Sequence, residues 1–369
     1  MKNFLKKAGT VLIILVVFVI GASYIKNKNR DVSKSIKVGV VLPLTGDSAF
    51  IGEDMKRGID LAAEEFPMAE FIYEDSAGNV KTAVSAYQKI LLNKPTVIIV
   101  AGTGVESIIP IAEENKIPTF LSVSSASGLP QQGEYIFRYF TNADNDAPVM
   151  AEYVVEKLGL KKFATLYLQD QFGIDYNEVF SHEVVRRGGE VVVSESFNYG
   201  NFDYRSQLTK LSEKEFDALY LIGLDFQLIR ALKEMKELGI STQILSLGTV
   251  ATRGAIEQAG TSIENVYLTA FCTDGSPEEY VVQFQNKYGI YPGFFSEIGY
   301  DIVQMLKKAS ENGREKKNIQ QGLLSIKNFT VNTGVVTSDP FGEMIIPMCV
   351  KKITGGKIFN TVTEKYSNY

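Results

Sequence analysis

Four serines stand close together directly after a short apolar run. They lie in Leu121–Gly128 and are Ser122, Ser124, Ser125 and Ser127. Hydroxyls and backbone amides of a loop at the carboxyl end of a strand can donate hydrogen bonds together, so this loop is suited to holding a carboxylate. A plain hydrophilic loop would have the same composition. The chain has no GxSxG motif and no histidine placed to activate a serine, which argues against nucleophilic catalysis.

A second candidate loop is the glycine-containing segment Val100–Ser107. It forms a GxGxxS pattern between an expected strand and an expected helix. A dinucleotide fingerprint needs an acid about 20 residues after its glycines, but Ser122 occupies that position. The segment is compatible with a tight turn or with a helix N-terminus that offers N–H groups to an anion. We therefore expect no cofactor.

Composition excludes several classes of function. Of the 369 residues, 45% are hydrophobic and 22% charged, which is typical of globular proteins. His182 is the only histidine, so a multi-histidine metal site is excluded, and its position inside an expected helix favours a solvent-exposed side chain. The two cysteines, Cys272 and Cys349, can form one disulfide or remain buried thiols. Residues 36–369 carry 31 Lys and Arg against 42 Asp and Glu, and this acidic balance argues against nucleic acid as a partner.

The amino terminus indicates export. Three lysines precede the apolar run Val11–Ile20, and the small residues Gly21–Ser23 follow it, which is the order of a secretory signal. The run is shorter than the roughly 20 apolar residues of a membrane span, so residues 1–23 are interpreted as a signal peptide, with an uncleaved anchor as the alternative. In either case we expect a periplasmic or cell-surface protein. Its N-terminal segment would contact the membrane, and residues 24–35 would act as a tether.

Alternating strand and helix patterns position the two loops. Apolar runs typical of buried strands are separated by helical segments of about 10–15 residues, which implies right-handed crossovers and parallel sheets. The first expected strands are Ile36–Leu42, Phe71–Tyr73, Val97–Val100 and Thr119–Val123. After polar residues 141–146 the pattern repeats in Phe163–Leu168, Val191–Phe197, Ala218–Ile222 and Ile244–Leu247. We therefore predict an α/β protein with two parallel sheets of similar size, followed by a strand pair formed by Gly334–Thr337 and Met344–Ile353.

Several motifs occur in an order known from one protein family. They are Val41–Gly46 with Gly52 and Gly58 behind it, Pro110–Pro118 before the serine loop, Ser296–Ile302, and Thr333–Gly342. Over residues 36–358 the chain resembles class I periplasmic solute-binding proteins. The branched-chain amino-acid (Leu/Ile/Val) receptors of ABC transporters are their best-known members.

The resemblance implies an α/β fold of two Rossmann-like lobes joined by a three-segment hinge, with the ligand in the cleft between them. The hinge segments are expected near residues 141–145, 268–274 and 337–341. Lobe 1 would contain residues 36–142 and 273–338, and lobe 2 residues 143–272 and 339–369.

The resemblance also implies a set of ligand-binding residues. Ser124, Ser125 and Ala126 match the family's carboxylate-holding turn. The amino-acid receptors hold the ammonium with a tyrosine and a carboxylate of the far lobe, but here Leu224 and the neighbourhood of Gly248–Thr249 stand at these positions. That departure argues against an α-amino acid, unless the adjacent Asp225 substitutes. The complete expected set is Thr103, Gly104, Ser124, Ser125, Ala126, Phe172, Leu224, Asp225, Phe50 and Thr249.

Together these inferences predict a binding protein that captures a small solute for ABC-type uptake. The solute would be an amino acid or a related carboxylate or amide, and Leu224 and Phe172 favour an apolar portion. A membrane permease as partner follows from the resemblance alone. Two alternatives stay open, a ligand-sensing ectodomain held by an uncleaved anchor and an α/β enzyme. The enzyme is disfavoured because no nucleophile–base pair, metal cluster or dinucleotide fingerprint is found.

Overall fold

The computed structural model describes residues 35–102, 104–126, 128–200, 203–251, 253–273 and 277–366. The expected signal peptide or anchor, the expected tether up to residue 34, and Thr103 lie outside these ranges. Within them, no helix is both long enough and apolar enough to cross a membrane.

One sheet is wholly parallel and contains the first strands of the chain, as expected. Its order is β2-β1-β3-β4-β5. The strands are β1 (Ile36–Leu42), β2 (Ala69–Asp75), β3 (Val97–Ala101), β4 (Thr119–Ser122) and β5 (Ile136–Arg138). Every residue of β3 and β4 is buried. Continuous apolar runs form such strands because helices cover both faces of a parallel sheet.

The second sheet is larger than predicted and only partly parallel. Its order is β16-β15-β14-β10-β9-β8-β6-β7, with antiparallel pairing from β10 through β14 and β15 to β16. The parallel strands are β6 (Lys162–Leu168), β7 (Glu190–Phe197), β8 (Ala218–Ile222), β9 (Gln243–Leu247) and β10 (Tyr267–Phe271). The antiparallel strands are β14 (Met348–Thr354), β15 (Lys357–Asn360) and β16 (Lys365–Tyr366).

The strand expected at Met344–Ile353 is divided, which corrects the prediction. Its first part, β13 (Met344–Ile345), pairs with β12 (Gly334–Ser338) in a small sheet that also holds β11 (Phe329–Val331). Pro347 then interrupts the ladder because it has no N–H to donate. The second part, β14, instead pairs with β10, and there Cys272 and Cys349 form a disulfide with a Cα–Cα distance of 5.0 Å.

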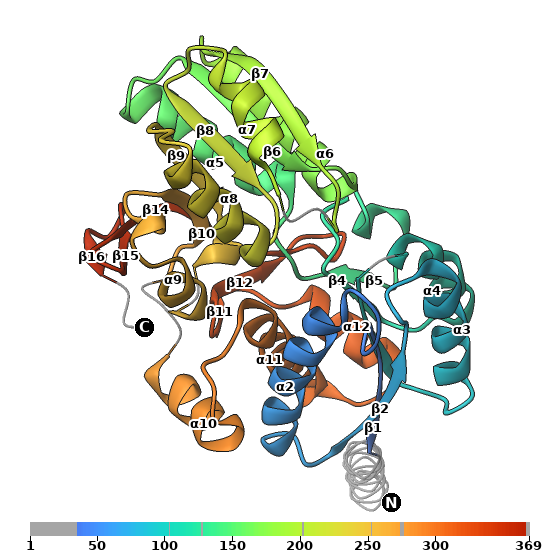
Figure 1. Ribbon diagram of the computed structural model, residues 1–369. Helices are drawn as coiled ribbons and strands as arrows, with labels where there is room; N and C mark the ends of the chain where they lie inside the picture. Colours follow the sequence, from blue (N-terminus) through green and yellow to red (C-terminus); the bar gives the residue numbers. More distant parts are fainter. Residues whose placement is uncertain are drawn as a thin grey trace, which may run out of the picture.

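Helices cover the faces of both large sheets (Figure 1). Those beside the first sheet are α2 (Ala49–Glu64), α3 (Val80–Leu91), α4 (Ile109–Asn115), α11 (Phe294–Ala309) and α12 (Lys316–Leu324). Those beside the second are α5 (Ala143–Glu152), α6 (Gln171–Arg186), α7 (Arg205–Ser212), α8 (Asp225–Glu237) and α9 (Arg253–Ala259), and α10 (Glu278–Tyr288) precedes α11. The helices α2 and α11 approach closely, since a Cβ on Gly58 would lie 1.8 Å from the Ser296 carbonyl oxygen.

The chain therefore forms two α/β lobes, and three segments run between them. These segments follow β5, follow β10 and connect β13 to β14. Figure 1 shows β6, β7 and β8 in the upper lobe and β1 and β2 in the lower lobe. The residue numbers assigned above to each lobe stay a prediction.

Candidate ligand-binding site

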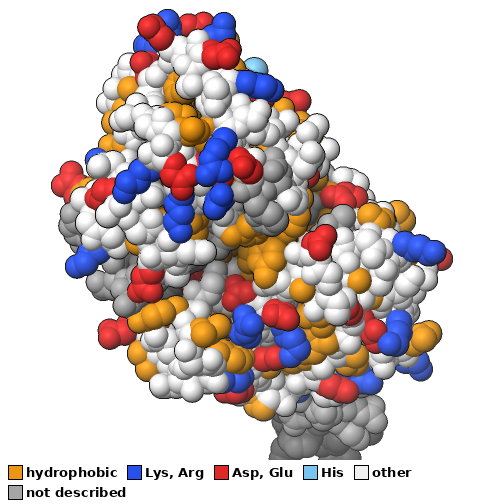
Figure 2. Space-filling model, in the orientation of Figure 1, with side chains coloured by type: hydrophobic (Ala, Val, Ile, Leu, Met, Phe, Trp, Pro, Cys, Tyr) orange, Lys and Arg blue, Asp and Glu red, His pale blue; other side chains and the backbone are white. Residues whose placement is uncertain are grey.

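A cavity of about 310 Å³ lies where the strand ends of the two lobes face each other. Its walls come from the loops after β3 and β4 on one side, and from the ends of β6, β9 and β10 with the first turn of α6 on the other. Figure 2 shows hydrophobic side chains gathered in the hollow between the two lobes. This is the position that the rule for open parallel sheets gives for a ligand.

The serine loop forms one end of the cavity and is held by hydrogen bonds from outside it. Ser124, Ser125 and Ala126 all line the cavity. The Ser124 hydroxyl donates to Glu106 Oε1 at 3.1 Å. Arg138 donates to the Ala126 carbonyl oxygen, and its Nε donates to Glu343 at 2.8 Å. The buried ion pair of Arg138 and Glu343 therefore fixes the turn from behind.

The glycine loop lies next to the serine loop, and Gly102 and Gly104 also line the cavity. Both adopt left-handed backbone conformations, with φ of 98° and 85°. A Cβ on Gly104 would come 2.8 Å from Val80 Cα. Glycine is thus required at this position for the close approach of the loop to α3.

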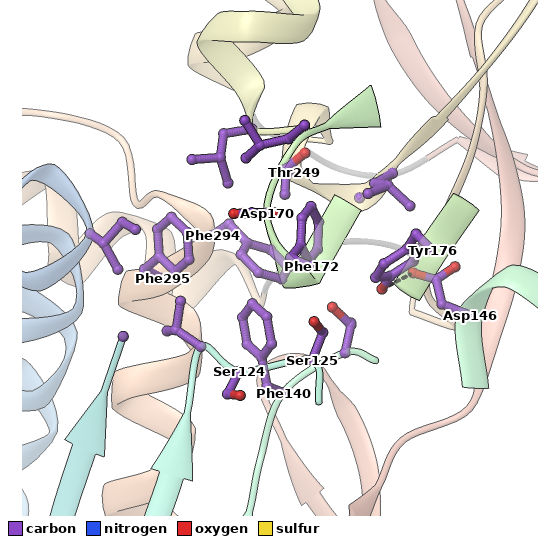
Figure 3. Close-up of a pocket in the computed structure, with 18 of the residues that line it drawn as sticks. Ser124, Ser125, Phe140, Asp146, Asp170, Phe172, Tyr176, Thr249, Phe294 and Phe295 are labelled. Carbon is purple, nitrogen blue, oxygen red and sulfur yellow. Dashed lines mark hydrogen bonds between the residues drawn. The ribbon is translucent and has the colours of Figure 1, made fainter. Parts of the chain in front are cut away.

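Aromatic rings form most of the remaining wall. Phe172 lies in the first turn of α6, and the centroid of its ring lies 4.9 Å from that of Tyr176. Phe140, Phe271, Phe294 and Phe295, which sequence reasoning missed, also line the cavity. Figure 3 shows the rings of Phe140, Phe172 and Phe294 directed toward the same space. Such a wall suits an apolar or aromatic part of a ligand.

The far-lobe positions singled out from the sequence are also brought to the cavity. Leu224 and Thr249 line it. The Leu224 N–H already donates to Gln227 Oε1 at 3.0 Å, and the Thr249 hydroxyl donates to the Gly223 carbonyl oxygen at 3.3 Å. Asp225 begins α8, but its side chain lies outside the described part of the structure.

Phe50 lies at the mouth rather than in the main cavity. It lines an adjoining pocket of about 230 Å³, which it shares with Leu224, Thr249 and Phe295. Its ring contacts Phe226 of the other lobe at 5.6 Å and Phe295 at 6.3 Å. Phe50 thus connects the two lobes across the entrance.

Three acidic residues line the cavity, and none of them was predicted from the sequence. Glu106 and Asp170 are exposed, whereas Asp146 is only 2% exposed. Tyr176 donates from its hydroxyl to Asp146 Oδ2 at 3.0 Å, as the dashed line in Figure 3 marks. Burial raises the pKa of Asp146 to about 6. Of the residues in this group, only Tyr176 could have been found from the sequence, because it stands one helical turn after the expected site residue Phe172.

The charged side chains that line the cavity are all acidic. None of the described residues that line the cavity is Lys, Arg or His. The described residues also contain no group of three His, Cys, Asp or Glu side chains placed to hold a metal ion.

Comparisons with known proteins agree with this architecture. A family model described as periplasmic binding protein matches residues 35–356. The chain is 24% identical over 317 residues to an amino acid binding protein of Pseudomonas aeruginosa, which covers 81% of this chain and 84% of the relative.

Two solved structures have the same fold. A leucine-binding protein of Thermotoga maritima superimposes with a TM-score of 0.78 at 23% identity, over 90% of this chain and 99% of that one. A solute-binding protein of an R. palustris ABC transporter, solved with benzoate, superimposes with a TM-score of 0.77 at 20% identity, over 89% of this chain and 95% of that one. The expected fold class and the family resemblance are thereby confirmed. The chain belongs to the periplasmic binding protein family and has its class I fold.

Proposed function

We propose that this protein is an exported solute-binding protein that captures a small molecule between its two lobes for an ABC-type permease. The observation that carries the proposal is the cavity between the strand ends of the two lobes, with loops that offer amides and hydroxyls on one side and aromatic rings on the other. Its volume of about 310 Å³ is within the range of small-molecule sites. The relatives' names, which include amino acid and leucine binding and a benzoate complex, support an amino acid or a related compound with an apolar part.

Capture would couple to closure of the lobes. Only a closed arrangement brings the serine loop and Phe172 to the same ligand, so the ligand would shift the population toward that state. The contact of Phe50 with Phe226 across the entrance would be made only in this closed arrangement. Delivery to a permease follows from the family.

Calorimetric titration of protein freed of ligand by unfolding and refolding tests the proposal. The panel is L-phenylalanine, L-leucine, 2-phenylethylamine, 3-phenylpropanoate and benzoate, and at least one should bind with a Kd near the micromolar range. Phe172→Ala should weaken that binding about tenfold or more, because the variant removes a ring from the cavity wall. Val185→Ala is the matched control, since Val185 lies on the same helix and is 62% exposed. Absence of binding by every compound, or equal binding by Phe172→Ala, would contradict the proposal.

A further inference from the structure

A group of buried oxygens at one end of the cavity lacks hydrogen-bond partners. Asp146 Oδ1, the Thr269 hydroxyl and the Tyr220 hydroxyl are all buried, and none of them has a hydrogen-bond partner of normal geometry among the described residues. Asp146 and Thr269 line the cavity. The Thr269 hydroxyl lies close enough to Asp146 and to Tyr220 to lower the pKa of both groups, so the three oxygens belong to one cluster.

Leaving these atoms unpaired is unfavourable. A buried polar atom without a partner costs about 1–3 kcal/mol, and a buried carboxylate costs more unless a donor or a cation meets it. The Tyr176 hydroxyl satisfies only Oδ2 of Asp146. Oδ1 can still accept one or two hydrogen bonds, and Asp146 is one of the residues that line the cavity.

The other two acids of the cavity differ from Asp146. Asp170 caps α6 by accepting from the Gly173 N–H at 2.9 Å, and Glu106 accepts from the Ser124 hydroxyl. Both are exposed to solvent and serve the protein's own groups. Asp146 alone of the three is buried with an oxygen left over.

The chemistry of the missing partner follows from these surroundings. It must donate hydrogen bonds, and a positive charge would be favoured by a wall with three acids and no described Lys, Arg or His. The rings of Phe172 and Tyr176 lie on the same side of the cavity and would favour a cation over their faces. A protonated amine meets all three conditions.

Resting on the proposed function, we propose that Asp146 and Thr269 form the subsite that binds a protonated amine of the solute. The subsite takes the role that the resemblance assigns to the far-lobe positions around Leu224 and Thr249. Leu224 offers only an apolar side chain, and the Thr249 hydroxyl is already bonded to the backbone. The amine is thus held from α5 and β10 instead of from the start of α8.

Calorimetry with three matched probes tests the subsite. L-Phenylalanine carries both charged groups, 2-phenylethylamine only the amine and 3-phenylpropanoate only the carboxylate. The two amines should bind at least tenfold more tightly than 3-phenylpropanoate. Asp146→Asn should weaken both amines at least tenfold, since Asn keeps an acceptor for Tyr176 but loses the charge, and it should not weaken 3-phenylpropanoate. Asp144→Asn is the matched control because it removes the same charge from the same helical turn without a place in the cavity wall.

The pH dependence gives an independent readout. The titratable groups that face Asp146 are Tyr176 on α6 and Tyr220 on β8, and burial raises the pKa of both phenols above 10. Asp146 is therefore the group whose protonation governs the subsite near pH 6. Affinity for 2-phenylethylamine should fall as the pH is lowered from 7.5 to 5, and in Asp146→Asn this dependence should disappear.

The outcomes separate the two proposals. If 3-phenylpropanoate binds as tightly as the amines, or if Asp146→Asn binds 2-phenylethylamine like the wild type, the amine subsite is wrong while solute capture stands. A crystal structure of the complex that shows only water at Asp146 Oδ1 would have the same meaning. If none of the probes or other panel compounds binds, both proposals are wrong.

Discussion

Two aspartates of this protein are equally buried yet stand in opposite surroundings. Asp301 on α11 is fully buried, and its carboxylate accepts from the Asn332 N–H at 2.9 Å, the Thr333 N–H and hydroxyl at 3.0 and 2.7 Å, and the Tyr139 hydroxyl at 2.9 Å. Asp146 on α5 is 2% exposed and, among the described residues, accepts one hydrogen bond of normal geometry, from the Tyr176 hydroxyl. Burial raises the pKa of each carboxyl to about 6.

The difference separates a structural acid from a candidate binding acid. Around Asp301 the protein supplies every donor, and these bonds tie α11 to the loop between β11 and β12. Around Asp146, which lines the cavity, the described residues supply one donor of normal geometry and leave Oδ1 without one. Burial and pKa are thus the same for both residues, and only the count of hydrogen-bond partners distinguishes them.

The largest effect on stability is expected for Asp301→Asn. Asparagine offers one acceptor oxygen, so its NH₂ would face a buried donor, and the remaining bonds would lose their charge assistance. We expect a loss of about 2–4 kcal/mol in the free energy of unfolding at pH 7.5. Urea unfolding followed by circular dichroism measures it. A loss under 1 kcal/mol would show that the Asp301 network does not stabilise the fold.

The same substitution at Asp146 should instead raise the free energy of unfolding. Because the folded-state pKa lies above the ordinary value of 3.8, this group favours folding when protonated, and its contribution is lost as the pH rises from about 4 through 6. Asparagine stays neutral at every pH, so Asp146→Asn avoids this loss of stability at high pH, and its side-chain oxygen still accepts from Tyr176. The variant should therefore gain up to about 3 kcal/mol over the wild type at pH 8, and little at pH 4. Urea unfolding at the two pH values measures the difference in the free energy of unfolding between the variant and the wild type. Destabilisation at pH 8 would mean that Asp146, like Asp301, is a structural residue.

Local pattern was sufficient for much of this fold. Val97–Val100 is continuously apolar and is predicted as a strand, and it forms all but the last residue of the buried strand β3. The position of the serine loop followed from the rule that parallel strands end at one edge of a sheet. In contrast, β14 lies against β10, which is about 80 residues earlier in the chain, and no local pattern indicates that pairing.

The residues of the candidate site also include some that the sequence could predict and others that it could not. Ser124, Phe172 and Leu224 stand at strand or helix ends and could be found there. Asp146 could not, because polar residues 141–146 are also typical of a connection between domains, and its burial depends on Tyr176 and Thr269 from distant segments. A buried aspartate with a missing partner is a property of packing, which a single sequence does not contain.

The smallest effects on the free energy of unfolding are expected when the tyrosines beside these two aspartates are replaced by phenylalanine. Tyr139 and Tyr220 are both fully buried, but only Tyr139 has bonded partners for its hydroxyl, Asp301 and Thr333. Tyr139→Phe should cost about 1–2 kcal/mol because it leaves an acceptor of Asp301 unpaired, whereas Tyr220→Phe should change stability by less than about 0.5 kcal/mol. Each variant is the control for the other, since both lose one hydroxyl from a filled core. Equal losses in urea unfolding would mean that the Tyr220 hydroxyl is bonded within the folded protein, and the cluster around Asp146 would then be no more open than the network around Asp301.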